Sequence, residues 1–359
     1  MRKIAWIILL SVFIFQLGRA VINYWPRYTQ NLGGPYWKTR YLESQWVVPD
    51  SKNSIGDDGL YAYHGYELVM GGDPTLINPE VPPLGKYLIG LCVLFLHNNN
   101  IFGLFTGIYC LTMFYLLNRV LFKDRLLAFI PLVLFVCEPL FVTQLQASYL
   151  DTLLLGTLFL SFFLFLKKWY IPAMMSVGCL AAIKFSYLSV FVVAAMGAYF
   201  LLRNNSQDRW KFIVPMVFVP GILLLSYLNY FLLGHTIIDF LKVQKYIINF
   251  YAIGAKAPIP VMVIPMLFLD KWYTWWNGVM KIDEWTILWP LATLGGLLSI
   301  FYLKQAGKFL LLMLWVAAYF VFLLLTPVWP RYLLLFLPFL YNLSIWALSQ
   351  NTKLRSFFQ

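Results

Sequence analysis

The chain has 359 residues, of which 61% are hydrophobic and only 12% are charged, and its mean hydropathy is +0.73. A typical soluble domain carries about 25% charged residues, so this composition excludes an ordinary soluble globular protein. The net charge is +12, but the lysines and arginines lie in short segments between apolar runs. That placement favours positive-inside topology and attraction to anionic lipids, and it argues against nucleic-acid binding.

Ten apolar segments are long enough to cross a membrane, which predicts an all-α polytopic membrane protein. They cover residues 4–22, 101–121, 126–146, 150–167, 169–184, 186–202, 211–233, 286–303, 308–325 and 331–349. Two further runs, 87–96 and 259–269, are short for a span, and we expect them to be interfacial or re-entrant. No linker divides the chain, so residues 1–359 are predicted to form a single membrane domain without a separate soluble domain.

Charge sets the expected orientation. With the N-terminus inside, ten spans place the short basic segments and both termini in the cytoplasm, as the positive-inside rule requires. Two long segments, 23–100 and 234–285, then lie on the outer face and carry most of the acids. We therefore expect a multi-pass protein of the cell membrane whose working surface faces outward.

Two adjacent carboxylates, Asp57 and Asp58, are the most informative residues of the first outer segment. Ser54 and Asp57 have the spacing of a capping box, which predicts a short helix from near Gly56 to about Met70. Capping alone would explain one of the two acids. The functional interpretation is a general base or a metal ligand held at the membrane surface.

A second unusual string, Glu80-Val-Pro-Pro-Leu-Gly-Lys86, follows on the same segment. Its two prolines stiffen the backbone where the chain re-enters the membrane interface. A plain turn with Lys86 reaching toward the headgroups is one interpretation. The other is that Glu80 and Lys86 are pinned near the acid pair.

Three further charged residues, Asp151, Lys184 and Arg331, fall at the outer ends of predicted spans. Each could cap a helix or anchor it at the interface. Charges inside spans are costly and functional by default, and cations level with the acids suit an anionic ligand. Glu138, before the helix-breaking Pro139, is given no role. The aromatic run 272–276 is expected at the interface, with a sugar-stacking or lipid-contact surface as the alternative.

The chain resembles the GT-C class of membrane glycosyltransferases, nearest the protein O-mannosyltransferases and aminoarabinose transferases. Asp57-Asp58-Gly-Leu-Tyr61 is similar to the Asp-Glu-x-x-Tyr/Phe string of that class, and Glu80 to Lys86 is similar to its Glu/Asp-His-Pro-Pro-Leu-Gly-Lys string. Asp151 resembles its second aspartate, and Arg331-Tyr332 with Pro338 resembles its C-terminal motif. Asp58 replaces the usual glutamate and Val81 the usual basic residue, which removes one phosphate contact.

The resemblance implies inverting transfer of a sugar from a polyprenyl-phosphate carrier to a hydroxyl acceptor. Asp57 would be the base. The implied substrate-binding residues are Asp58, Tyr61, Glu80, Lys86, Asp151, Lys184 and Arg331. No cofactor is certain; a divalent metal ion on Asp57, Asp58 and Glu80 is the alternative to metal-free catalysis. The expected partners are the lipid-linked donor, the acceptor and membrane lipids, with no nucleic acid.

Two other function classes compete with this interpretation. A transporter or flippase for a lipid-linked or small polar solute should carry mid-span acids and inverted repeats, and neither is evident in the sequence. A non-catalytic assembly subunit would not need the intact set of acids.

The orientation has a direct test. Single cysteines introduced near residue 75 should react with a membrane-impermeant thiol reagent from outside intact cells, whereas cysteines near residue 206 should not. The reverse labelling pattern would overturn the grouping of the acids on the outer face.

Overall fold

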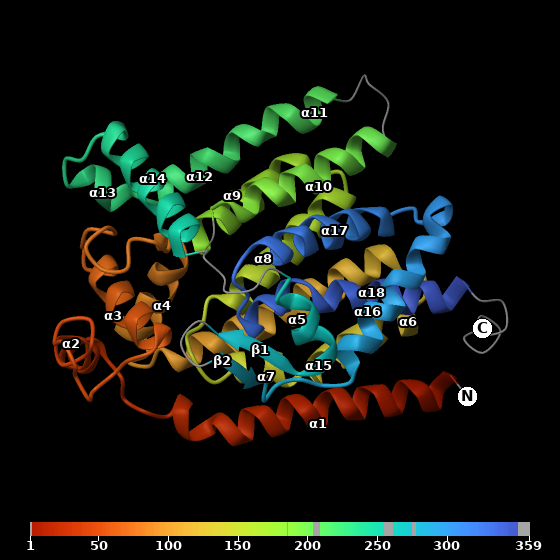
Figure 1. Cartoon of the computed structure of the whole chain (residues 1–359), viewed down its shortest axis with the longest axis horizontal. Coiled ribbons are helices and arrows are strands. Elements are labelled where there is room, and N and C mark those ends of the chain that lie inside the picture. Colours follow the sequence, from red (N-terminus) through yellow and green to blue (C-terminus); the bar gives the residue numbers. More distant parts are fainter. Residues whose placement is uncertain (1, 185, 204–208, 255–260, 275–277, 351–359) are drawn as a thin grey trace.

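The computed structural model describes residues 2–184, 186–203, 209–254, 261–274 and 278–350, without the side chains of 251–254. The described chain is helical apart from one small hairpin, which confirms the predicted all-α class. Figure 1 shows a helical bundle. The N-terminal end of α1 and the C-terminal end of α18 lie at the same end of it.

The first outer segment forms three short helices at the opposite end of the bundle (Figure 1). After the long α1 (Arg2–Tyr28) come α2 (Gly34–Leu42), α3 (Asp57–Val69) and α4 (Pro83–Phe95). The predicted helix from Gly56 to Met70 is confirmed as α3. Its capping box is wrong, however, because the N-cap is Gly56, which has no side chain to bond to the N–H groups of the first turn.

The middle of the chain supplies the packed core. Its helices are α5 (Asn100–Leu121), α6 (Arg125–Val136), α7 (Pro139–Gln144), α8 (Asp151–Leu166), α9 (Tyr170–Ile183) and α10 (Leu188–Arg203). α8 is buried along most of its length and packs against both α5 and α9. Because α8 begins at Asp151, this central helix carries a predicted site residue on its first turn.

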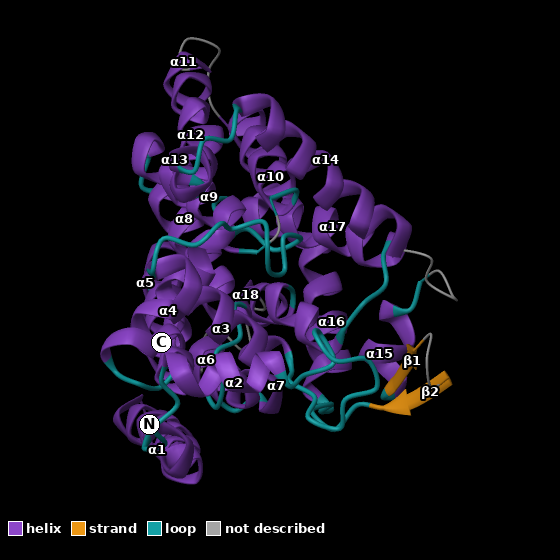
Figure 2. Cartoon of the chain, turned by 90° about the vertical axis from the view of Figure 1, so that its left-hand side faces the viewer, coloured by secondary structure: helices purple, strands orange, loops and turns teal. Residues whose placement is uncertain are grey.

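The second outer segment and its flanks are built from short pieces. They are α11 (Arg209–Ile213), the 3₁₀ turn η2 (Val214–Val217), α12 (Phe218–Ser226), α13 (Leu228–Leu232), α14 (Ile237–Gly254) and α15 (Val263–Leu269). The strands β1 (Lys271–Thr274) and β2 (Gly278–Lys281) pair antiparallel, with Trp272 opposite Met280. Figure 2 shows this hairpin beside α15 on one flank of the molecule.

Trp272, expected at the interface, is covered by other parts of the protein. It is buried, and its indole Nε1 donates a hydrogen bond of 2.8 Å to the carbonyl of Val328. Residues 275–277 of the same aromatic run, and the loop 204–208, lie outside the described residues. Trp272 therefore ties the hairpin to the segment that precedes Arg331.

The last part of the chain closes the bundle with α16 (Leu288–Leu298), η3 (Ser299–Gln305), α17 (Phe309–Leu325), η4 (Pro330–Leu335) and α18 (Leu337–Gln350). Glu138, at the break between α6 and α7, connects this part to the core. Its carboxylate accepts hydrogen bonds from Tyr341 Oη at 2.5 Å, Trp289 Nε1 at 2.8 Å and Thr286 Oγ1 at 3.3 Å. The buried acid is thus a cross-link that the sequence analysis left without a role.

Within the part of the chain that the structure describes, three helical stretches are long and apolar enough to cross a membrane: Arg2–Tyr28, Asn100–Leu121 and Arg209–Ser226. Two of the predicted spans are interrupted. Pro139 separates α6 from α7 as expected. The stretch Arg209–Ser226, which covers residues 211–226 of the predicted span 211–233, is itself a series of short helices containing Pro215 and Pro220. Proline removes a backbone donor and clashes with the preceding turn. The apolar runs therefore predicted where helical segments lie, but not whether each segment is one unbroken helix.

Glycine permits a close contact between α3 and α4. A β-carbon at Gly90 would lie 2.0 Å from the carbonyl oxygen of Gly65, and one at Gly65 would lie 2.2 Å from that of Lys86. Both obstacles are backbone atoms, so no change of rotamer relieves them. The two helices can approach this closely only without side chains at these positions.

We expect Gly90→Ala to destabilise the protein, because overpacking of a fitted contact costs about 1–3 kcal/mol. The measurement is the thermal unfolding midpoint of the purified protein in detergent. Gly221→Ala on α12 is the matched control, since nothing lies within 4 Å of its new β-carbon. An unchanged midpoint for Gly90→Ala would show that the α3–α4 contact is looser than described.

Candidate active site

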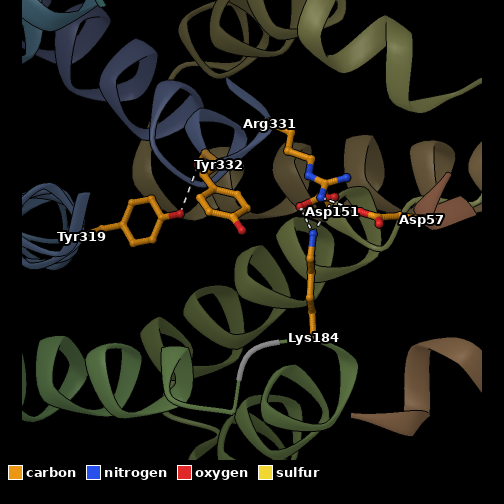
Figure 3. Close-up of polar contacts among 6 residues, drawn as sticks. All are labelled: Asp57, Asp151, Lys184, Tyr319, Arg331 and Tyr332. Atoms are coloured by element: carbon orange, nitrogen blue, oxygen red, sulfur yellow. Dashed lines mark hydrogen bonds and ion pairs between the residues drawn. The ribbon is translucent and has the colours of Figure 1, made fainter. Parts of the chain in front are cut away.

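The first half of the candidate site is an ion pair between a residue of the N-terminal part of the chain and one of the C-terminal part. Arg331 Nη2 on η4 donates to Asp57 Oδ2 on α3 at 2.6 Å, across 274 residues of sequence (Figure 3). The side chains are 21% and 38% exposed, respectively. Arg331 Nε is buried and has no hydrogen-bond partner among the described residues. The guanidinium therefore holds the base candidate with one nitrogen and keeps another N–H free.

The second half is a fully buried pair. Lys184 Nζ, at the end of α9, contacts both carboxylate oxygens of Asp151, at 2.7 and 2.9 Å. Each side chain is only 3% exposed. Asp151 thus does not act as a helix cap, because its carboxylate is used on Lys184. Arg331 lies close enough to Asp151 to interact electrostatically, so the two pairs form one cluster.

Aromatic rings enclose this cluster. The Tyr149 and Trp329 rings lie 5.9 and 5.6 Å from the Arg331 guanidinium carbon, within the range of a cation–π contact. The Tyr332 ring lies 5.7 Å from Lys184 Nζ, and Tyr319 Oη donates to the Tyr332 carbonyl at 3.1 Å (Figure 3). Tyr61 is buried and interacts electrostatically with Arg331. The cations are therefore held in a largely apolar surround.

A hydrogen-bonded chain fixes Asp57 and Asp58 against the start of α8. Ser148 Oγ donates to the Asp58 carbonyl at 3.0 Å and accepts from Asn99 Nδ2 at 2.8 Å, while Asn99 Oδ1 accepts from Trp37 Nε1 at 3.2 Å. Ser148 and Asn99 are fully buried. None of these three hydrogen bonds was expected from the sequence. Their one visible signal is the run of three asparagines, 98–100, ahead of a span.

Glycine also explains part of the acid string. A β-carbon at Gly59 would lie 2.7 Å from the indole of Trp37. Trp37 is itself held by Asn99, so a side chain at position 59 would push α3 away from the hydrogen-bonded chain. The residue after the acid pair is thus part of the positioning of the acids.

Glu80 and Lys86 form a separate group. Lys86 is completely buried and donates to the Asn78 carbonyl at 2.9 Å, and the Asn78 side chain donates to Glu80. Among the described residues neither Glu80 nor Lys86 makes a hydrogen bond or ion pair with Asp57 or Asp58. Burial lowers the pKa of the Lys86 amine to about 7, against the opposing charge of Glu80. The cluster therefore contains Asp57, Asp151, Lys184 and Arg331, and Lys86 is hydrogen-bonded to Asn78 outside it.

No group of three or more His, Cys, Asp or Glu side chains suited to a metal ion is found within the described residues. Asp57, Asp58 and Glu80, the alternative metal ligands, do not form such a group. The two carboxylates of the acid pair have different surroundings. Asp57 forms an ion pair with Arg331, and Asp58 is half-buried at the N-terminus of α3.

The same fold occurs in two solved structures of ArnT from Cupriavidus metallidurans. The apo structure shares 17% identity at a TM-score of 0.52, covering 84% of this chain and 56% of that one. The structure bound to undecaprenyl phosphate shares 15% identity at a TM-score of 0.54, covering 99% of this chain and 61% of that one. The chain has a GT-C fold. It is a multi-pass membrane protein by that fold and its apolar helices.

The chain spans about three fifths of the length of these ArnT structures. No protein-family model matches the sequence, and no curated protein matches it. The GT-C fold is therefore carried here by a sequence that has diverged far from these two structures, and the functional residues must be argued from their geometry.

Asp58 generates a pH prediction, because α3 lies outside the predicted spans. Burial raises the pKa of its carboxyl above the ordinary 3.8, the N–H groups of Gly59 and Asp58 oppose this rise, and the charge of Asp57 adds to it. A raised pKa means that ionised Asp58 destabilises the fold. The penalty is absent below the ordinary value and is complete above the raised one.

Asp58→Asn should therefore gain stability relative to the wild type as the pH rises through the raised pKa, and lose that gain in acid. Thermal unfolding of both proteins in detergent, from about pH 4 to pH 8, measures the difference. A difference that is constant across this range would contradict the prediction.

Proposed function

We propose that this protein is an inverting glycosyltransferase that moves a sugar from a polyprenyl-phosphate carrier to a hydroxyl acceptor on the outer face of the cell membrane. The observation that carries the proposal is the cluster of Asp57, Arg331, Asp151 and Lys184. It joins one base candidate to two cations on a GT-C fold. One ArnT structure with this fold has undecaprenyl phosphate bound, which supports a donor of that chemical kind.

The leaving group of such a reaction is a lipid phosphate, and the cluster has the charges to receive it. Arg331 can bind phosphate oxygens through two N–H groups at once, and its Nε is buried without a partner among the described residues. Lys184 adds a second cation beside it. Such cations stabilise charge as it develops in the transition state, most strongly where water is excluded.

Asp57 is the proposed general base. Its Oδ2 accepts a hydrogen bond from Arg331 Nη2, and a carboxylate held in place in this way is a suitable group to accept a proton. When the donor phosphate engages Arg331, the pair loosens and Asp57 is freed for the acceptor. The acceptor hydroxyl then gives its proton to Asp57, its oxygen bonds to the anomeric carbon, and the phosphate leaves with the electrons of the broken carbon–oxygen bond.

The remaining site residues are proposed to position these groups. Asp151 keeps Lys184 in place through two hydrogen bonds. Asp58 and Tyr61 face the acceptor and donor from α3. Glu80 and Lys86 hold the loop ahead of α4 by meeting at Asn78, and Lys86 can become fully charged when a phosphate approaches. Because base catalysis supplies about 10²–10⁴-fold, most of the acceleration must come from positioning and charge.

We expect Asp57→Asn to lower the rate of sugar transfer from a polyprenyl-phosphate donor by at least about 10²-fold, the ordinary contribution of a general base. The assay is turnover of the radiolabelled donor by full-length protein in detergent or proteoliposomes. The unfolding midpoint checks that the variant is folded.

Glu67→Gln, ten residues further along α3, is the matched control and should retain activity. Near-wild-type turnover of Asp57→Asn would rule out Asp57 as the base. Absence of transfer by the wild-type protein from a range of polyprenyl-phosphate sugars to hydroxyl acceptors would contradict the proposed reaction.

A further inference from the structure

A basic cavity lies at the end of the bundle away from the candidate active site. It has a volume of about 280 Å³ and is lined by Lys168, Arg203 and Lys308 together with Tyr170 and Tyr199. α8 connects the two ends: it starts at Asp151 and stops at Leu166, which also lines this cavity. Its 16 residues separate them by about 24 Å.

The three cations come from different parts of the chain. Lys168 follows α8, Arg203 ends α10, and Lys308 precedes α17. The described lining contains no acidic residue. Lys167 adds to the repulsion, since its charge acts on Lys308. Like charges gathered around one concavity repel one another, and an anion in the cavity would offset that repulsion.

An ordinary explanation covers only part of this arrangement. Lys168 and Arg203 lie at the C-terminal ends of helices, where a cation is favourable. Lys308 is the N-cap of α17, where the helix dipole disfavours a cation. α9 also begins at the cavity, with Tyr170. Two helices therefore begin at this cavity, and the positive end of a helix dipole favours an anion.

A larger and more apolar groove of about 510 Å³ adjoins the cavity and shares Lys168 and Tyr170 with it. Its lining includes Trp169 and Trp210, which are 57% and 71% exposed, and Val214. Exposed tryptophans of this kind are typical of the membrane interface. A charged cavity continuous with an apolar groove matches a molecule with a phosphate head and a hydrocarbon tail.

We infer that this end of the bundle binds an anionic phospholipid, with the phosphate between Lys168, Arg203 and Lys308 and an acyl chain along the groove. Basic pockets between membrane helices bind anionic headgroups in this way. A cavity of about 280 Å³ is at the small end of the range for ligand sites, which suits a headgroup rather than a whole lipid. The inference goes beyond the proposed transferase activity and does not depend on it.

The test titrates the full-length protein, in a neutral detergent, with dioleoyl phosphatidylglycerol. Bound lipid is measured by native mass spectrometry and stabilisation by the unfolding midpoint. The double variant Arg203→Gln/Lys308→Gln should bind this lipid about 25-fold more weakly, at about fivefold for each cation removed. All substituted side chains are exposed, and unfolding in lipid-free detergent checks that the variant is folded.

The matched control is Lys123→Gln/Lys304→Gln, which removes the same charge from exposed positions outside the cavity lining. It should bind the lipid like the wild type. An equal loss in both double variants would overturn the inference, since the attraction would then belong to the whole basic surface. Equal binding of phosphatidylcholine would overturn it as well, because the cavity would not be selecting negative charge.

Two further arms separate a lipid from a soluble phosphate. Val214→Asn in the groove should weaken binding of the lipid but leave binding of inorganic phosphate unchanged. Inorganic phosphate alone should stabilise the protein far less than phosphatidylglycerol does. Stabilisation by phosphate equal to that by the lipid, together with no effect of Val214→Asn, would identify a soluble phosphate as the ligand and overturn the lipid assignment.

Discussion

The ion pair between Asp57 and Arg331 is the constraint on which the candidate site depends. It joins α3, in the first outer segment, to η4, near the last span. Around it, Ser148 fixes the backbone of Asp58 and Trp272 fixes the carbonyl of Val328, three residues before Arg331. Both ends of the pair are thus held by hydrogen bonds from other elements. The proposed base and a cation are thus kept in contact, and under the proposed function a donor phosphate would replace the base as the partner of the cation.

The two ion pairs of the cluster differ in what they mean energetically. The Asp151–Lys184 pair is fully buried, and removing one partner of such a pair costs about 3–5 kcal/mol because the other charge is left uncompensated. The Asp57–Arg331 pair is partly exposed, and solvent screens it. A substitution at Asp151 would therefore mix folding with catalysis, whereas a substitution at Asp57 reports mainly on chemistry. Neither pair is a strong source of stability, which is consistent with their being kept for function.

Much of the fold could be predicted from apolar length, and the acid string located α3 correctly. Gly56 before the helix and Gly71-Gly72 after it are local signals. The capping box failed because Ser54 and Asp57 satisfy a spacing rule that does not specify where a side chain points. The Asp57–Arg331 and Asp151–Lys184 pairs join residues far apart in sequence. Topology predicted their common level in the membrane, but only packing could choose which acid meets which cation.

Glu138 is a further residue whose partners could not be predicted from the sequence. A lone acid before a proline gives no indication of its partners, which come from α16, α18 and the turn between β2 and α16. Likewise, the hairpin β1–β2 is four residues a strand, too short for an alternating pattern to stand out from a loop. These features depend on side chains that meet only after the helices have packed.

The charges behind the net value of +12 are arranged differently at the two ends of the bundle. At the end of the bundle with α3, acids meet cations from other elements, as Asp57 does with Arg331 and Asp151 with Lys184. At the other end, Lys168, Arg203 and Lys308 converge on a cavity whose described lining has no acid. Charge is thus balanced inside the candidate active site and left unbalanced near the far ends of the same helices. An excess cation at a membrane interface is stabilised by an anionic lipid, so the lipid proposed for this cavity would neutralise the three cations that the fold itself leaves without an acid in the lining.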